Sequence, residues 1–375
     1  MLNRDLLYES DPLADAVVDS LAGLPVKTQW QLFGGFLRGE VPEDGRIAAC
    51  LNELQVAASE HCSVESLAGL NDAGRVFYRS GLLGGLVLGL RSLVSGYADP
   101  RGNKPLTFTG TLESSARRRL AETAKFVTAV TEPGAMRPGA NGFNITLHVR
   151  LMHAHVRRQL SEHSGWQLAN WGVPINQHDM LATTLLFSNV FIEGVELFGV
   201  KVTDSERESY QRLWRQIALV LGVREDILPR DFHEAQRLSR EVRRGQGAPD
   251  DDARTLTRVL LDQPLYEAKS ARQREVARRQ IAFAEALAWE LLDEDVCVGL
   301  HLQRPSWSGS SFSLARLSRF GLLPLEALRR GAALDDYVEG IGRNYWQRNL
   351  KLGLRGATDL FQLAPGLSGR RAQWS

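Results

Sequence analysis

Apolar residues recur at intervals of three and four along most of the chain, the spacing that places side chains on one face of an α-helix. One such series is Ile145, Val149, Met152, Val156 and Leu160. The pattern predicts an all-α protein built as a multi-helix bundle. Helices are expected near residues 11–23, 28–38, 46–59, 75–95, 112–131, 142–164, 177–194, 204–222, 231–245, 251–262, 267–293 and 313–350.

Two segments interrupt this helical pattern. Residues 105–112, "PLTFTGTL", alternate with a period of two, which predicts a short strand or an extended arm. Residues 243–254, "RRGQGAPDDDAR", combine Gly and Pro with three aspartates, which is typical of a solvated loop. We therefore expect an N-terminal helical layer (1–60), a helical core (61–240) and a C-terminal helical layer (241–375), packed as one structural domain.

The segment "GLLGGLVLGLRSLV", which begins at Gly81, is the longest apolar run noted in this chain. It is shorter than the roughly 20 residues of a membrane-spanning helix and contains Arg91. We therefore predict a buried helix and no membrane span. Glycine in a helix interior costs about 1 kcal/mol relative to alanine. Its four glycines indicate either tight helix packing or the close approach of another backbone or a flat ligand.

Composition narrows the functional classes. The chain has 375 residues and a formal net charge of +1, which gives no global reason to expect a nucleic-acid partner. The N-terminal sequence "MLNRDLLYESDPLADAVVDS" carries acidic residues where a signal peptide has a basic and then an apolar region, so we expect a cytoplasmic protein. Three scattered cysteines, Cys50, Cys62 and Cys297, are typical of buried free thiols.

The most unusual stretch is "VRLMHAHVRRQLSEHSGW" at residues 149–166. On a helix, Arg150, His153 and Arg157 share one face, whereas His155 lies about 200° from His153. His148 and His155 therefore belong to another side, and the two histidines of "HAH" cannot bind one metal ion.

Neighbouring arginines disfavour the protonated imidazole of His153, and a neutral imidazole is a ligand or a base. The arginines require anions, which could be protein carboxylates, a phosphate or the propionates of a haem. The alternative is a structural helix whose arginines pair with acidic neighbours and whose histidine forms ordinary hydrogen bonds. Residue spacing alone does not distinguish these interpretations.

The preceding helix carries a second polar set. Arg119 and Thr123 share a face, and Glu122 lies beside them. These side chains could line a polar site, or Glu122 could pair with Arg118 or Arg119 at a wet surface.

The spacing Arg119-x-x-x-Thr123, followed by Arg150-x-x-His153-x-x-x-Arg157, resembles the haem-site pattern of the latex clearing proteins and the wider MpaB-type oxygenase superfamily. Residues 176–188, "NQHDMLATTLLFS", also resemble a segment of that superfamily. The resemblance covers residues 75–225. It implies a globin-like core within residues 61–240 that binds haem b.

By the same resemblance, His153 would be the proximal iron ligand, and Arg119, Thr123, Arg150 and Arg157 would surround the haem. The rubber oxygenases open isoprenoid carbon–carbon double bonds with dioxygen. They carry a lysine beside the threonine, where this chain has Glu122. Glu122 and Thr123 are the predicted catalytic residues, with Glu122 as a general acid or base.

The resulting hypothesis is a haem b-dependent oxygenase with a small apolar substrate and dioxygen as its partners. A non-catalytic haem sensor or carrier, a haem peroxygenase that uses peroxide, and a cofactor-free helical interaction protein are the alternatives. The sequence leaves open the substrate, the oligomeric state and the role of Asp179, Thr183 and Phe187, which share a helical face.

Overall fold

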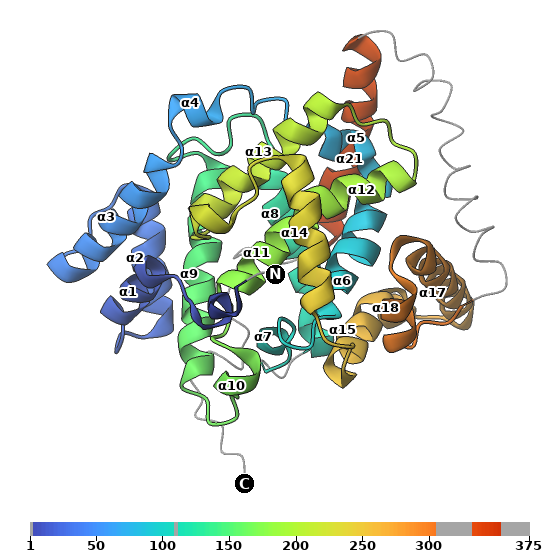
Figure 1. The fold of residues 1–375 in the computed structure, drawn as a ribbon, viewed down its shortest axis with the longest axis horizontal. Helices are drawn as coiled ribbons and strands as arrows, with labels where there is room; N and C mark the ends of the chain where they lie inside the picture. The colour runs from blue at the N-terminus through green and yellow to red at the C-terminus, as the bar shows by residue number, and fades with distance from the viewer. Residues whose placement is uncertain (1–2, 109–111, 305–331, 354–375) are drawn as a thin grey trace.

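The computed structural model describes residues 3–108, 112–304 and 332–353, with the side chains of residues 112–119, 332–334 and 352–353 left out. All secondary structure in these ranges is helical (Figure 1). The predicted all-α class is therefore confirmed.

The longer helices are α1 (Pro12–Ser20), α2 (Val26–Leu37), α3 (Gly45–Glu60), α5 (Arg75–Val87), α8 (Leu112–Val130), α9 (Asn141–Ser161), α11 (Gln177–Phe187), α12 (Asn189–Leu197), α13 (Asp204–Val220), α14 (Phe232–Gly245), α15 (Asp251–Leu261), α17 (Ala271–Leu291) and α21 (Ala332–Gly353). Shorter turns are η1 (Arg4–Tyr8), α4 (Val64–Leu67), the π-helix η2 (Leu88–Leu93), α6 (Val94–Tyr97), α7 (Lys104–Thr107), α10 (Leu168–Trp171), η3 (Glu225–Ile227), α16 (Gln263–Glu267) and α18 (Glu294–Gly299).

Several predicted helices are divided in the structure. The helix expected at 75–95 becomes α5, η2 and α6, with a kink at Gly81 where φ is 47° and ψ is −122°. The helix expected at 177–194 breaks at Ser188, whose φ of −96° and ψ of −99° are not helical. Periodicity does not detect such breaks, because the apolar spacing continues through them. Part of the helix expected at 313–350 lies outside the described residues.

The strand predicted within residues 105–112 is wrong where the structure describes it. Residues 104–107 form the short helix α7, which has Pro105 in its first turn. Proline fits the first turn of a helix, since its fixed φ is helical and its missing N–H would have no partner there. The helical preference of this proline decides the local structure, and the short alternating pattern does not.

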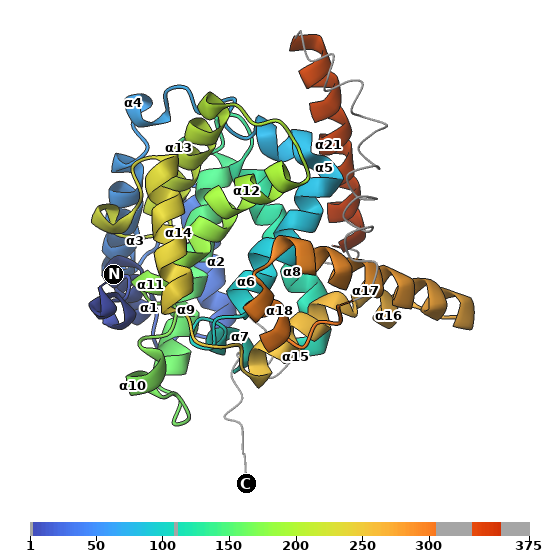
Figure 2. The same ribbon diagram turned by 45° about the vertical axis from the view of Figure 1, so that its right-hand side comes forward.

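The helices form layers around a central group (Figures 1 and 2). Helices α1, α2 and α3 lie on one side, next to α9, and α15, α17 and α18 lie on the opposite side. Helices α11 and α13 lie between them, and α21 packs along α5.

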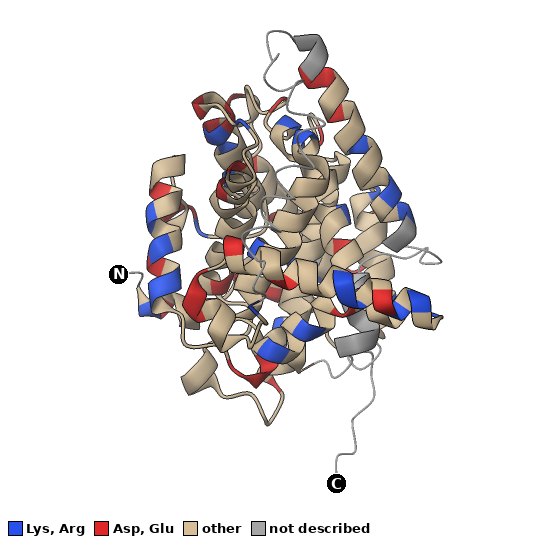
Figure 3. Ribbon diagram, turned by 90° about the vertical axis from the view of Figure 1, so that its right-hand side faces the viewer, with Lys and Arg blue, Asp and Glu red and all other residues tan. Residues whose placement is uncertain are grey.

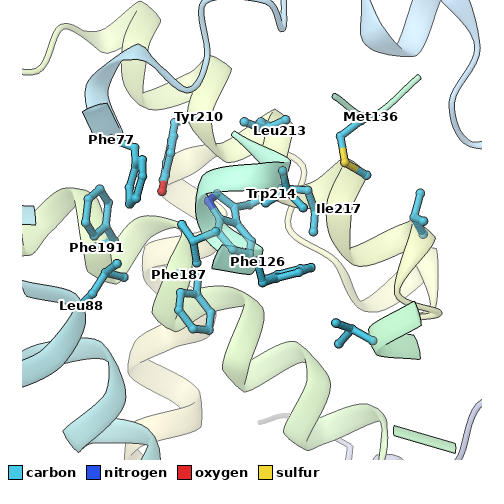
Figure 4. Packing of buried hydrophobic residues seen from close by; sticks show 14 of the residues in the cluster. Phe77, Leu88, Phe126, Met136, Phe187, Phe191, Tyr210, Leu213, Trp214 and Ile217 are labelled. Atoms are coloured by element: carbon cyan, nitrogen blue, oxygen red, sulfur yellow. The ribbon is translucent and has the colours of Figure 1, made fainter. Parts of the chain in front are cut away.

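One hydrophobic cluster joins the three predicted parts of the chain. It includes Val17 from the N-terminal layer, Trp214 from the core and Leu287 from the C-terminal layer. At its centre Phe187 stacks on Trp214, with ring centroids 5.2 Å apart and an interplanar angle of 12° (Figure 4). Offset aromatic stacking of this kind fixes the relative positions of α11 and α13.

Gly81 of the apolar run lies against another backbone, whereas Gly84 and Gly85 lie against side chains. A Cβ atom at Gly81 would lie 3.4 Å from the Cα atom of Gly342 on α21. Beside this contact Phe77 stacks on Trp346, with ring centroids 4.6 Å apart. The expectation that another backbone approaches this segment is confirmed.

Charged residues lie along the outer helices, and the most apolar stretch lies in the core. Acidic and basic residues are interspersed along the helices on the side shown in Figure 3. Within the described residues, one helical stretch, Gln177–Leu197, is long and apolar enough to cross a membrane by length and composition. Its most apolar window is 67% buried in the protein, as expected for core helices, so this is weak support for a span.

Candidate functional site

The site is built on α9, whose start is fixed against α8. A Cβ atom at Gly142 would lie only 3.0 Å from the carbonyl oxygen of Ala129, so the two helices touch where α9 begins. The chain turns back within residues 131–140, and α8 and α9 pack along each other. His153, three turns into α9, therefore lies at about the level of Arg119 on α8. The predicted proximity of the two sequence motifs agrees with this register.

His153 is half-buried, and its Nδ1 atom is buried without a hydrogen-bond partner. Burial of the ring, and then the nearby Arg157 guanidinium, lower the pKa of His153 to about 4, while the Asp11 carboxylate acts in the opposite direction. The imidazole is therefore neutral at physiological pH, as the sequence predicted. A neutral ring with an unused nitrogen can serve as a metal ligand or accept a proton.

Arg150 is engaged by the N-terminal helix. Its Nε and one terminal nitrogen donate to the two carboxylate oxygens of Asp11, at 2.6 and 2.8 Å, and its other nitrogen donates to the Val220 carbonyl at 3.2 Å. Both members of the pair are buried, with side chains only 5% and 3% exposed. Gly222 leaves room for the pair, since a Cβ atom there would lie 2.3 Å from Asp11 Oδ2.

Arg157 is engaged in a similar way. It forms an ion pair with Asp15 and donates to the carbonyls of Pro174 and Ile175, at 3.2 and 3.0 Å. Ile175 has a φ of 53°, which is strained for a β-branched residue. Arg157 thus holds the strained loop that leads into α11.

These contacts change the interpretation of the two arginines. The resemblance implied that Arg150 and Arg157 surround a haem, and haem propionates were one of the possible anions for them. In the structure the nitrogens of both guanidinium groups donate to protein carboxylates and carbonyls. The alternative that these arginines pair with acidic neighbours describes them better. They position α9 and the loop before α11 around His153.

Sequence reasoning missed the carboxylates that pair with these arginines. Asp11, Asp15 and Asp19 recur every four residues along α1 and its N-cap, and they pair with Arg150, Arg157 and Arg158 of α9. The four-residue spacing was a detectable signal of one acidic helix face. What the sequence did not show is that α1 packs along α9.

The opposite side of α9 holds the other two histidines. His148 stacks on Trp30 of α2 with ring centroids 4.7 Å apart, and His155 lies 6.2 Å from the same ring. A ring nitrogen of His155 lies 2.9 Å from Nε2 of Gln159. The predicted separation of His153 from His148 and His155 is therefore confirmed.

Helix α8 contributes Glu122 and Thr123, which are both half-buried. Burial lowers the pKa of the nearby Lys125, while the Glu122 carboxylate acts in the opposite direction. Lys125 is a polar residue of this helix that sequence reasoning did not single out. The side chain of Arg119 lies outside the described residues.

The segment that begins at Asn176 has several distinct roles. Asn176 caps α11 by accepting a hydrogen bond from the Asp179 amide at 3.0 Å. Thr183 is exposed, although Leu181, Thr184 and Leu185 around it are buried. Phe187, expected on the same face as Thr183, packs instead against Trp214 in the core.

His178 and Asp179 lie next to each other at the start of α11. His178 is buried, with Nδ1 3.7 Å from an oxygen of Asp179. Burial raises the pKa of Asp179. These two groups form a small polar cluster of their own.

The potential metal ligands near His153 fit a metal that is already bound within a cofactor. Among the residues that the structure describes, no three His, Cys, Asp or Glu side chains gather as a metal site. A haem needs only an axial protein ligand, because the porphyrin supplies the other nitrogens. A site with His153 as its protein ligand therefore fits a haem better than a metal site built from protein ligands alone.

Comparison with known proteins relates this chain to oxygenases. A solved structure described as the latex clearing protein LCP in the closed state has the same fold, with a TM-score of 0.69 over 92% of each chain and 21% sequence identity. A rubber oxygenase of Streptomyces sp. (strain K30) is 26% identical over 258 residues, which are 68% of this chain and 62% of that protein. The match thus spans less than two thirds of that relative's length.

The family model described as "ER-bound oxygenase mpaB/B'/Rubber oxygenase, catalytic domain" matches residues 78–320. This range includes α8, α9 and α11, and therefore every predicted site residue. It leaves out Asp11 and Asp15, which hold the two arginines. Since the matched range is well over half of the chain, the chain belongs to the family of MpaB-type and rubber oxygenase catalytic domains.

Proposed function

We propose that this protein is a haem b-dependent oxygenase that uses dioxygen to cleave a carbon–carbon double bond in a small apolar substrate of alkene or isoprenoid type. Membership of an oxygenase family supports the reaction class. The observation that carries the assignment of haem is His153, which is neutral and has a buried ring nitrogen without a partner.

His153 is the residue that would bind the haem iron, and Thr123 and Arg119 of α8 would be neighbours of the cofactor. Haem, when bound, would supply an iron centre at which dioxygen can be activated. The Arg150–Asp11 pair and the Arg157 contacts keep α9 in one orientation, so that the His153 ring keeps its position. This is the supporting role that residues behind a metal ligand generally have.

Glu122 and Thr123 are the proposed polar groups of the substrate side. The Thr123 hydroxyl can donate one hydrogen bond, and the Glu122 carboxyl can accept or return a proton. The surrounding helices would exclude water from an apolar substrate. A cytoplasmic location is part of this proposal.

Two other functions would also use a haem bound by His153. A haem sensor or carrier would bind haem without turnover, and a haem peroxygenase would use peroxide in place of dioxygen. Oxygen and peroxide consumption with a panel of terpenoid, polyene and aromatic compounds separates these functions.

In the same assays Glu122→Gln should slow turnover and leave the ferric haem spectrum nearly unchanged.

The decisive test is the optical spectrum of the purified protein with and without dithionite and carbon monoxide. We expect a Soret band in the wild-type protein and its loss in His153→Ala. His155→Ala is the matched control, because it removes a histidine from the other face of the same helix. Retention of haem by His153→Ala, with loss in His155→Ala, would refute the assignment of the ligand.

A further inference from the structure

A cavity that no residue of α9 lines lies between the chain after α3 and the loop that joins α8 to α9. Its volume is about 540 Å³, within the range of roughly 300–1,000 Å³ typical of small-molecule sites. Neither His153 nor Thr123 lines it. The cavity is therefore not explained by the proposed haem site.

The lining of this cavity is mainly apolar. Its walls include Cys62, Leu67, Leu70, Ala135, Met136 and Leu213. Figure 4 shows Met136 and Leu213 next to the aromatic core. Val64, also in the lining, is 85% exposed, although apolar side chains gain free energy when they are covered. These features fit the apolar body of a ligand.

The charged residues of the lining are Glu132 and Arg137. The Glu132 carboxylate accepts hydrogen bonds from Arg343 and from the Tyr78 hydroxyl, each at 2.8 Å, so its charge is already compensated. Arg137 is exposed and has no ion pair among the described residues. Asn71 adds a side-chain amide to the same lining. The cavity thus offers one uncompensated cation and an additional hydrogen-bond donor.

We propose that this cavity binds an amphipathic monocarboxylate, with the apolar chain inside and the carboxylate on Arg137. A guanidinium group matches a carboxylate through two parallel hydrogen bonds. A cationic amphiphile would meet Arg137 with like charge, and a neutral one would leave the guanidinium without a partner. The proposal does not depend on the haem assignment.

The test is calorimetric titration of the full chain with dodecanoate below its micelle-forming concentration. We expect one dodecanoate per chain. Arg137→Gln should weaken binding about tenfold, the effect of losing one charge-assisted contact. Dodecyltrimethylammonium should bind at least tenfold more weakly than dodecanoate, because it carries the opposite charge on the same apolar chain.

Two further variants locate the site. Ala68→Trp places a large ring at an exposed position of the lining and should abolish binding. Arg230→Gln removes an exposed arginine outside the lining and should leave the affinity unchanged.

Any of three results would overturn the proposal. The first is no binding of dodecanoate to the wild-type chain. The second is equal affinity in wild type and Arg137→Gln. The third is binding that shifts the haem spectrum and survives Ala68→Trp, which would place the carboxylate at the haem instead.

Discussion

Helix α9 carries histidines on two faces, and the two faces have different surroundings. On one face, His153 lies between arginines that are held by carboxylates of α1 and its N-cap, and its Nδ1 atom has no hydrogen-bond partner. On the other face, His148 and His155 lie against Trp30, and His155 contacts Gln159. Both faces contain a buried nitrogen without a hydrogen-bond partner, Nδ1 of His153 on the first and Nε1 of Trp30 on the second. The faces differ in their charges, since only the first places the imidazole between two arginines that are paired with carboxylates.

The surroundings of His153, together with its unpartnered nitrogen, make it the candidate ligand. Buried polar atoms almost always have a hydrogen-bond partner, so an exception requires an explanation. Around His153 the neighbouring charges are paired with each other rather than with the imidazole. The ring therefore remains neutral and available, while its neighbours supply rigidity.

The largest effect on stability is expected when the ion pair between Arg150 and Asp11 is removed. Arg150→Ala leaves Asp11 buried without its partner, which should lower the free energy of unfolding by about 3–5 kcal/mol. Chemical denaturation measures this. Arg158→Ala is the matched control, because its pair with Asp19 is 35% and 64% exposed and should contribute about 1 kcal/mol or less.

A double variant shows whether the loss of stability comes from losing the ion pair or from leaving the Asp11 carboxylate buried alone. Asp11→Leu combined with Arg150→Met removes both charges at once and should recover most of the lost stability. If the double variant is as unstable as Arg150→Ala, the penalty does not come from an isolated carboxylate.

The second effect concerns the packing face. Trp30→Ala removes the ring that contacts His148 and His155, and it should lower the free energy of unfolding by about 2 kcal/mol, since Trp30 is only half-buried. Haem content, measured per folded chain from the Soret absorbance, should not change. Loss of haem in this variant would mean that the two faces are not independent.

The smallest effect is expected for Arg157→Lys. Lysine can keep the ion pair with Asp15 but cannot also donate to the carbonyls of Pro174 and Ile175, so the free energy of unfolding should fall by about 1 kcal/mol. Hydrogen exchange at residues 173–176 should become faster, and haem occupancy should decrease. Unchanged exchange in this loop would show that Arg157 does not hold it.

The sequence predicted the local features of this molecule better than its long-range contacts. Apolar spacing located α9 and separated His153 from His155, because both follow from helix geometry alone. It did not detect the break at Ser188 or the turn α7, where local backbone preferences decide the structure. The resemblance to a known family identified His153 as the candidate ligand.

The contacts of the arginines could not be predicted in the same way. Asp11 and Arg150 are 139 positions apart, and their pairing depends on the packing of α1 against α9 and on the space left at Gly222. The sequence showed both the aspartates and the arginines, but it did not show that they lie close together in the fold. Thr183 and Phe187 show the same limit, since one face of α11 holds both an exposed and a buried residue.

The contact between α5 and α21 has a consequence for biosynthesis. Gly342 and Trp346 cover Gly81 and Phe77, which leave the ribosome more than 250 residues earlier. Until α21 has been translated, the apolar side of α5 has no cover and is a target for chaperones or for aggregation. A nascent chain stalled before residue 332 would therefore expose this surface, and quality control could recognise the incomplete product there.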